Sequence, residues 1–289
     1  MVPTVSTLFT VPPMLAAVPL NAESLFGFVT NSMFVAVIVT TVILLFTRMA
    51  TRRMETIPGK KQNLVEFVVE FVLTELEGIL GRKIALKVFP LLATIFVFIL
   101  VSNWFGLLPG VGSIGYGEQT GPLTLDASKH YTPYLRPATA DLNMNLGMAA
   151  VFMIVWLYIS IQEVGLGGFL KHIFGAKGGM TGLLGLLMAV IFFIVGIIEV
   201  ISILFRPVSL SLRLFGNIFA GETLLHTMAE LGEKMGWPDA LAFVGRVVLP
   251  IPFYFMELLV GLVQAIVFTL LCAVYVQLST AHDEEEHHH

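Results

Sequence analysis

The chain has 289 residues, of which 56% are hydrophobic and only 12% charged, with a formal net charge of -4. A soluble domain carries about 25% charged residues, so this composition excludes a soluble enzyme and predicts an integral membrane protein. The single cysteine, Cys272, lies in an apolar run, which excludes a disulfide or a thiolate metal cluster within the chain. We interpret Cys272 as a small packing residue.

Residues 1–31 are interpreted as an extracytoplasmic N-terminal tail, because no lysine or arginine precedes Arg48. The apolar run from Leu15 to Leu20 also resembles part of a signal peptide, although the positively charged region that normally precedes such a run is missing. A tail and a processed segment therefore stay open as alternatives.

The first membrane span is predicted from about Ser32 to Phe46. The basic cluster Thr47–Arg53 follows it and should stay in the cytoplasm, so the N-terminus is expected outside. After a turn at Pro58-Gly-Lys-Lys, polar residues recur at steps of three and four, as on an amphipathic helix at the membrane surface. These residues are Asn63, Glu66, Glu70, Thr74 and Glu77.

The next two spans are predicted to cross outward and back. The first runs from Phe89 to Leu108 and ends at Pro109-Gly, with a cytoplasmic start marked by Arg82, Lys83 and Lys87. The loop 110–140 carries little positive charge and is expected outside. The second runs from Asp141 to Ile161 and leads into a Gly-rich cytoplasmic loop with three basic residues, Lys171, His172 and Lys177.

The stretch from Leu183 to Thr227 has 45 residues, which as a continuous helix would be about 68 Å long at ~1.5 Å per residue. Two spans or one oblique helix would fit it, and we favour one long, tilted helix. A final span from Arg246 to Leu278 then returns to the cytoplasm. The chain shows no internal repeat, which disfavours an inverted-repeat transporter.

These segments predict an all-α polytopic membrane protein with about five membrane-embedded helices and one amphipathic surface helix. Residues 32–278 would form a single membrane domain with a cytoplasmic C-terminus. Residues 279–289 would be an acidic and His-rich tail, whose histidines are interpreted as a solvated tail or an added tag and not as a metal site.

Four charges within the stretch 183–227 mark the candidate site, because placing one in a bilayer costs at least ~2.5 to 3.5 kcal/mol. The central one is Arg213, whose guanidinium stays protonated under all conditions a cell offers and cannot escape burial by becoming neutral. It therefore needs a partner or a water-lined cavity. Steps of three and four place six polar residues on one helical face, namely Glu199, Ser202, Arg206, Ser209, Arg213 and Asn217.

A second polar face of the same predicted helix carries Glu222 and His226, and the final span carries Glu257 and Gln264 on one face. The carboxylates and His226 can bind and release protons where water reaches them, whereas Arg213 can only favour the ionised form of a partner carboxylate. This combination suits two aqueous half-channels separated by a positive barrier.

Each candidate also has a structural alternative. Glu222 and Glu257 would form an internally paired structural site, and Glu199 with Arg206 a stabilising pair near the cytoplasmic surface. His226 would be an interfacial packing residue, and Gln264 would make an ordinary hydrogen bond between helices. At the level of the whole chain, the alternatives are an independent secondary transporter and a structural membrane anchor.

The segment from Pro207 to Glu222, PVSLSLRLFGNIFAGE, closely resembles the signature of subunit a of F-type ATP synthases. The resemblance covers the chain from about Ser32 to Leu278. Its other segments are Pro58-Gly-Lys, Asn103–Pro109, Thr139–Asn143 and Gln264–Thr269.

The resemblance implies a non-catalytic, stationary channel subunit without cofactors, in the bacterial inner membrane. Its partners would be a rotating ring of c subunits, b-type peripheral stalk subunits and the rest of the ATP synthase. The last two membrane helices would be long and steeply tilted around the ring. Proton flow would be coupled to ring rotation and to ATP synthesis or hydrolysis, although sodium-translocating versions share this plan.

The resemblance also assigns roles to the candidate residues. Arg213 takes the position of the essential arginine that displaces the ion from each ring carboxylate. The extracytoplasmic path would use Asn217, Glu222, Glu257 and Gln264, and the cytoplasmic exit Glu199, Ser202 and Ser209. The family commonly pairs a carboxylate with a histidine at the positions of Glu222 and Glu257. Because both are glutamate here, the order of proton transfer between them stays open.

Overall fold

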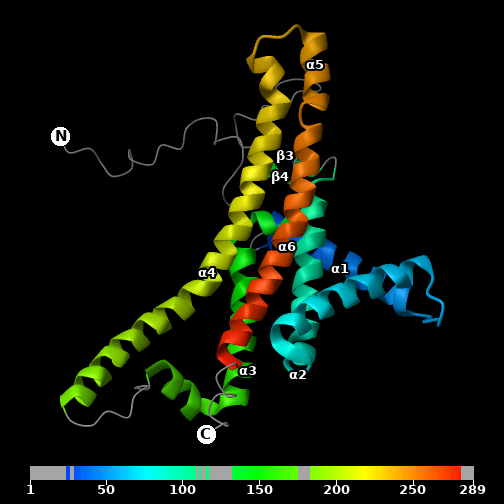
Figure 1. The fold of residues 1–289 in the computed structure, drawn as a ribbon. Helices are drawn as coiled ribbons and strands as arrows, with labels where there is room; N and C mark the ends of the chain where they lie inside the picture. The colour runs from blue at the N-terminus through cyan, green and yellow to red at the C-terminus, as the bar shows by residue number, and fades with distance from the viewer. Residues whose placement is uncertain are drawn as a thin grey trace, which may run out of the picture. The chain divides into compact units, whose positions relative to one another are not determined.

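A computed structural model describes residues 24–26, 29–108, 111, 115–116, 132–174 and 183–280. Helices make up most of this part of the chain (Figure 1). They are α1 (Asn31–Thr51), α2 (Lys60–Gly106), α3 (Leu142–Phe174), α4 (Leu183–Lys234), α5 (Asp239–Val248) and α6 (Ile251–Thr280), with a 3-10 turn, η2, at Ala138–Ala140.

The strands form two small antiparallel hairpins. One pairs β1 (Ser24–Phe26) with β2 (Val29–Thr30), and the other pairs β3 (Gly115–Tyr116) with β4 (Thr132–Pro133). The second hairpin lies in the predicted extracytoplasmic loop, where the sequence pattern did not indicate strands.

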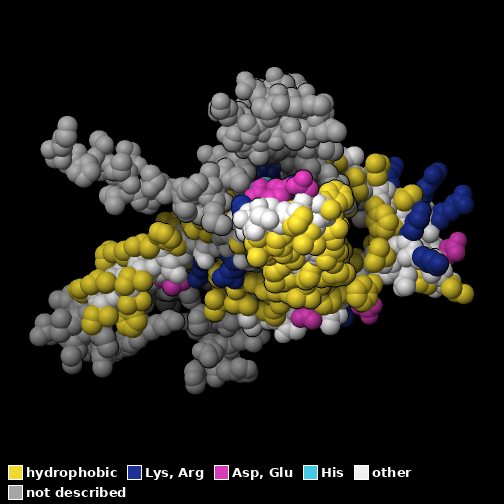
Figure 2. Space-filling model, turned by 90° about the horizontal axis from the view of Figure 1, so that it is seen from above, with side chains coloured by type: hydrophobic (Ala, Val, Ile, Leu, Met, Phe, Trp, Pro, Cys, Tyr) yellow, Lys and Arg dark blue, Asp and Glu magenta, His cyan; other side chains and the backbone are white. Residues whose placement is uncertain are grey.

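Five helical stretches of the described chain are long and apolar enough to cross a membrane. They are Asn31–Thr51, Lys60–Gly106, Leu142–Gln162, Val190–Lys234 and Asp239–Ser279. Much of their apolar surface is exposed, as the yellow side chains in Figure 2 show, which is the arrangement a lipid environment requires. The predicted all-α polytopic fold is confirmed, and the orientation of the termini stays a prediction.

The chain divides into two compact units. The first comprises residues 1–46, 98–144 and 214–265, and the second comprises 47–97, 145–213 and 266–289. Each has its own buried apolar residues: Val35, Ile99, Leu214 and Ile218 in the first, and Leu76, Leu92, Phe152, Leu210 and Phe268 in the second. Cys272 is completely buried in the second unit, as expected of a packing residue.

Helix α2 contains both the predicted surface helix and the span that follows it. Gly81 separates them, because its φ of 70° and ψ of 157° lie outside the helical region. A left-handed φ of this kind favours glycine, which has no Cβ to clash with the backbone. The helix therefore changes direction where the amphipathic pattern ends.

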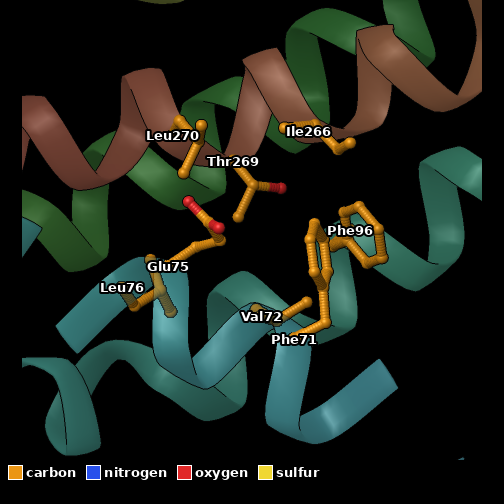
Figure 3. Close-up of a pocket in the computed structure, with 8 residues that line it drawn as sticks. All are labelled: Phe71, Val72, Glu75, Leu76, Phe96, Ile266, Thr269 and Leu270. Carbon is orange, nitrogen blue, oxygen red and sulfur yellow. The ribbon is translucent and has the colours of Figure 1, made fainter. Parts of the chain in front are cut away.

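The surface-helix part of α2 packs its apolar face against α6 in the second unit. Figure 3 shows a pocket where Phe71 and Phe96 line one side and the Glu75 side chain rises toward Thr269 on α6. The two phenylalanine rings lie 6.1 Å apart. The lining residues include none of the candidate site residues, so we assign the pocket to packing.

The structure corrects the predicted loop after the third span. Helix α3 continues to Phe174, with a non-helical residue at Gly165, whose φ is 76°. Lys171 and His172 therefore lie on a helix and not in a Gly-rich loop. A single left-handed glycine interrupts the helix, and the apolar residues that follow resume it. Lys177 lies outside the described residues.

The last two long elements agree only in part with the prediction. Helix α4 is one continuous helix of 52 residues, as expected, and includes Pro207. The predicted final span from Arg246 to Leu278 is interrupted, because a turn at Leu249 and Pro250 separates α5 from α6. Proline has no N–H to continue the helical ladder, and the next helix begins directly after it.

Three predictions concern residues that the structure does not describe. They are the N-terminal tail before Ser24 with its possible signal peptide, the end of the predicted second span at Pro109-Gly110, and the acidic and His-rich tail from residue 281 onward.

Candidate functional site

In the first unit, an amide pair links α4 to α6. The Asn217 Nδ2 atom donates a hydrogen bond to Gln264 Oε1 at 2.6 Å. Gln264 is buried, with only 4% of its surface exposed. The sequence placed these residues on separate helices, and the structure brings their side chains together.

One turn further along α4, the Glu257 carboxyl from α6 packs directly over Gly221. A Cβ atom added at Gly221 would lie 2.2 Å from the carboxyl carbon and from each of its oxygens. Glu257 is only 7% exposed. Glycine at position 221 therefore makes room for this carboxyl beside the next residue of α4, Glu222.

Glu222 is half-buried and directly follows Gly221, over which the Glu257 carboxyl packs. Arg136 is buried, with 3% exposure, and its Nη2 atom donates to the Ala140 carbonyl oxygen at 3.2 Å. The hydrogen bond fixes the guanidinium at the end of η2, just before α3 begins. The first unit thus contains two carboxyls and one permanent cation.

The end of α2 holds the same part of α6 in place. Asn103 Nδ2 donates to the Gly261 carbonyl oxygen, and Trp104 Nε1 donates to the Leu258 carbonyl oxygen, both at 3.1 Å. These carbonyls lie between Glu257 and Gln264 along α6. The two hydrogen bonds therefore set the position of the α6 segment that carries both candidate residues.

Sequence reasoning missed Arg136 and the roles of Asn103 and Trp104. We treated the loop before α3 as weakly charged, and the available signal was the closeness of Arg136 to the Thr139–Asn143 segment. Asn103 and Trp104 belong to a segment that carried the family resemblance. Their acceptors are backbone carbonyls, which a side-chain pattern does not reveal.

In the second unit, Arg206 is held between two aromatic rings. Its guanidinium carbon lies 5.7 Å from the Trp156 ring and 4.9 Å from the Tyr275 ring. Its Nη2 atom donates to Glu199 Oε1 at 3.1 Å. Trp156 in turn donates from Nε1 to the Tyr275 carbonyl oxygen at 2.8 Å. Arg206 is thus fixed by packing and orients Glu199.

The other predicted residues of the second unit lie on an open surface. Ser202, Ser209 and Arg213 are all exposed. Within the described part of the chain, the Arg213 guanidinium has no ion-pair or hydrogen-bond partner. Arg213, whose charge needs a counter-ion or water inside a membrane, is therefore exposed on the surface of α4.

His226 belongs to a separate row of charges on α4 in the first unit. Its Nδ1 atom lies 3.3 Å from Glu230 Oε1, and Glu230 Oε2 lies 2.8 Å from Lys234 Nζ. The structure therefore gives His226 a partner other than Glu222 and Glu257, with which the sequence had grouped it.

Comparison with known proteins supports the resemblance along most of the chain. The family described as ATP synthase A chain matches residues 33–277. ATP synthase subunit a of Protochlamydia amoebophila is 33% identical over 251 residues, which are 87% of this chain and 80% of the relative. ATP synthase subunit a 3 of Pelobacter propionicus is 34% identical, covering 85% and 84%. ATP synthase subunit a of Aliivibrio salmonicida is 33% identical, covering 89% and 85%.

Proposed function

Because the chain belongs to the ATP synthase A chain family, it is a multi-pass membrane subunit of the Fo sector, and we propose that it is the stationary, non-catalytic proton channel. It would provide two aqueous half-channels to and from the carboxylates of a c-subunit ring. Its other partners would be b-type peripheral stalk subunits. The membrane would be the bacterial inner membrane.

The observation that carries the proposal is the exposed Arg213 on α4. A guanidinium keeps its charge under all conditions a cell offers, and no described residue of this chain supplies its counter-ion. A carboxylate on a passing c subunit has the required charge. Arg213 would favour the ionised form of that carboxylate, release its proton and block direct leakage between the half-channels.

The extracytoplasmic half-channel would use the polar groups of the first unit, Asn217, Gln264, Glu222 and Glu257. Support comes from the hydrogen bond between Asn217 and Gln264 and from the Glu257 carboxyl, which packs over Gly221 beside Glu222. Asn103 Oδ1 is buried there without a hydrogen-bond partner among the described residues, and a buried acceptor of this kind suits an ordered water molecule. His226 would lie at the outer end of the path.

The cytoplasmic half-channel would use Glu199, Ser202 and Ser209. Glu199 is oriented by Arg206, and its side chain is 42% exposed, so this chain leaves it open to water or to a partner. The carboxylate would accept the released proton, and the two hydroxyls would support a hydrogen-bonded path toward it.

The test is ATP-driven ion transport by the assembled complex in sealed vesicles, with and without sodium at fixed pH. We expect acidification of the vesicle interior that does not require sodium and is not inhibited by it. Sodium uptake that persists when the proton gradient is dissipated would show the sodium-translocating alternative. Transport of a solute by the purified chain alone would contradict the channel-subunit assignment.

Gly221→Ala is expected to impair transport without preventing folding. The added Cβ would occupy the space of the Glu257 carboxyl, but that carboxyl is the far end of a flexible side chain and can move. Because misplacing a reacting group by ~1 Å can slow a reaction by about 10²-fold, we expect ATP-driven pumping to fall by about 10- to 100-fold. Pumping is measured by fluorescence quenching in inverted vesicles.

The matched control is Gly216→Ala, where a Cβ would meet nothing within 4 Å. Equal amounts of assembled complex in both variants would separate a transport defect from a folding defect. Normal pumping by Gly221→Ala would show that the position of the Glu257 carboxyl does not limit transport.

A further inference from the structure

The segment that connects α1 to α2 carries a concentration of positive charge that the channel does not use. Between residues 47 and 61, five cations accompany one carboxylate, Glu55. The cations are Arg48, Arg52, Arg53, Lys60 and Lys61, and all five are exposed. Figure 2 shows Lys and Arg side chains gathered at the right of the view.

These charges are not neutralised within the described chain. None of the five cations has a carboxylate within ion-pair distance there. Lys61 Nζ contacts only the Met49 sulfur, at 3.6 Å. An unneutralised cluster of this size requires an anionic partner or exposure to water.

The connection has a defined shape that presents the cations outward. Gln62 is only 8% exposed, and it closes the segment through two hydrogen bonds to the backbone of Glu55. It donates from Nε2 to the Glu55 carbonyl oxygen at 3.0 Å and accepts from the Glu55 N–H at 3.2 Å. The Gln62 side chain is therefore buried against the backbone of the segment, and the charged side chains are exposed.

Two large apolar side chains are exposed among the cations. Ile57 is 84% exposed and Met54 is 68% exposed. Apolar side chains flanked by Lys and Arg are typical of segments that insert into the boundary between lipid headgroups and acyl chains. The segment also continues directly from α1, a candidate membrane span that ends in basic residues, so it lies at a membrane surface.

We propose that residues 48–61 form an anchor for anionic phospholipid headgroups, which we call the basic hairpin. The cations would bind lipid phosphates, while Met54 and Ile57 enter the upper acyl region. Clusters of four to eight basic residues beside a membrane span have the charge needed for such binding. The anchor would fix the α1–α2 connection of this stationary subunit against the bilayer.

The test uses the assembled ATP synthase with a nitroxide on Thr56→Cys, next to Ile57. Native Cys272 is completely buried, so it does not compete within this chain. The complex is placed in vesicles of phosphatidylcholine alone or mixed with phosphatidylglycerol. Electron paramagnetic resonance then compares collisions of the label with oxygen, which is enriched in lipid, and with a water-soluble nickel chelate.

We expect phosphatidylglycerol to raise the ratio of oxygen to nickel collisions, and ~1 M salt to reverse the change, because the Debye length is then only ~3 Å. Each cation near an anionic surface contributes about fivefold to the attraction. A combined variant, R52Q with R53Q, K60Q and K61Q, should therefore lose the response to phosphatidylglycerol. The control, R82Q with K83Q, removes two exposed cations of α2 outside the basic hairpin and should keep the response.

A ratio that is the same in both vesicle compositions would overturn the proposal. Shielding of the label from both oxygen and nickel would also overturn it, because a protein subunit would then cover the basic hairpin. If the combined variant does not assemble, the comparison of lipids and salt with the unmodified charges still decides the question.

Discussion

Arg213→Ala is expected to abolish coupled proton pumping while leaving the complex assembled. An opposite charge within ~4–6 Å lowers the pKa of a carboxyl group by about 1–3 units. Without the guanidinium, the ratio of ionised to protonated ring carboxylate at a given pH would fall by about 10- to 1,000-fold. Because each turn of the ring requires many such releases, ATP-driven pumping and ATP synthesis should both be lost.

The same substitution should also increase passive proton flow through the membrane sector, because the positive barrier between the half-channels is removed. Arg213→Lys is not expected to restore synthesis, since a lysine can lose its proton when desolvated and lacks the planar fork of donors. Leu204→Ala is the control, because Leu204 is an exposed apolar residue on the same helix. Intact coupled pumping by Arg213→Ala would remove the central claim of the proposed function.

The Arg213 side chain has no partner among the described residues, so its removal should not unfold the protein. The amount of assembled complex has to be measured beside transport to check this expectation. Arg206 provides the contrast. It is held by Trp156, Tyr275 and Glu199, so its removal would disturb packing as well as charge. Of the two arginines of α4, Arg206 belongs to a structural ion pair with Glu199, whereas Arg213 lies on an open surface.

Helical periodicity was sufficient to predict most of the fold. The polar pattern of α2 followed from spacings of three and four residues, whereas the choice of one long α4 over two spans rested partly on the family resemblance. The same spacing placed Asn217 and Gln264 on polar faces, and their hydrogen bond is a direct consequence of two such faces meeting. Periodicity alone does not contain the register between the helices, which the structure supplies.

Other features depended on backbone geometry that a side-chain pattern does not encode. The interruption at Leu249 and Pro250 was missed because an apolar run on both sides concealed the proline. Arg136 was missed because its burial depends on the path of an irregular loop. Gly221 was read as part of a signature, and only the structure shows that its missing Cβ is the space that the Glu257 carboxyl occupies.

The carboxyl pair leads to the second large effect, which concerns Glu222→Gln and Glu257→Gln. Glutamine keeps the shape and hydrogen-bonding capacity of the side chain but cannot transfer a proton. A positioned acid or base contributes about 10²- to 10⁴-fold to a proton-transfer step. If the two groups act in series on one path, each single variant should lower pumping by about 10²-fold or more, at unchanged amounts of assembled complex.

The double variant separates a proton path from a structural pair. Residues that act as a unit give strongly non-additive effects, so the double variant should pump about as slowly as the slower single variant. A structural pair would behave differently: the single variants would lower the amount of assembled complex, and each complex formed would pump normally. Glu233→Gln is the control, because Glu233 is an exposed carboxylate of α4 that pairs with Arg246 and lies outside the proposed path.

The order of transfer between the two carboxyls can be read from Glu257→His and Glu222→His. An imidazole titrates near neutral pH and can still carry a proton, so a histidine at either position should support pumping that a glutamine does not. Histidine in place of the carboxyl nearer the extracytoplasmic water should shift the dependence of pumping on the external pH. Histidine in place of the inner carboxyl should change the maximal rate of pumping instead. Equal shifts from both replacements would mean that the two carboxyls exchange one proton as a coupled pair, with Gly221 keeping them close enough to do so.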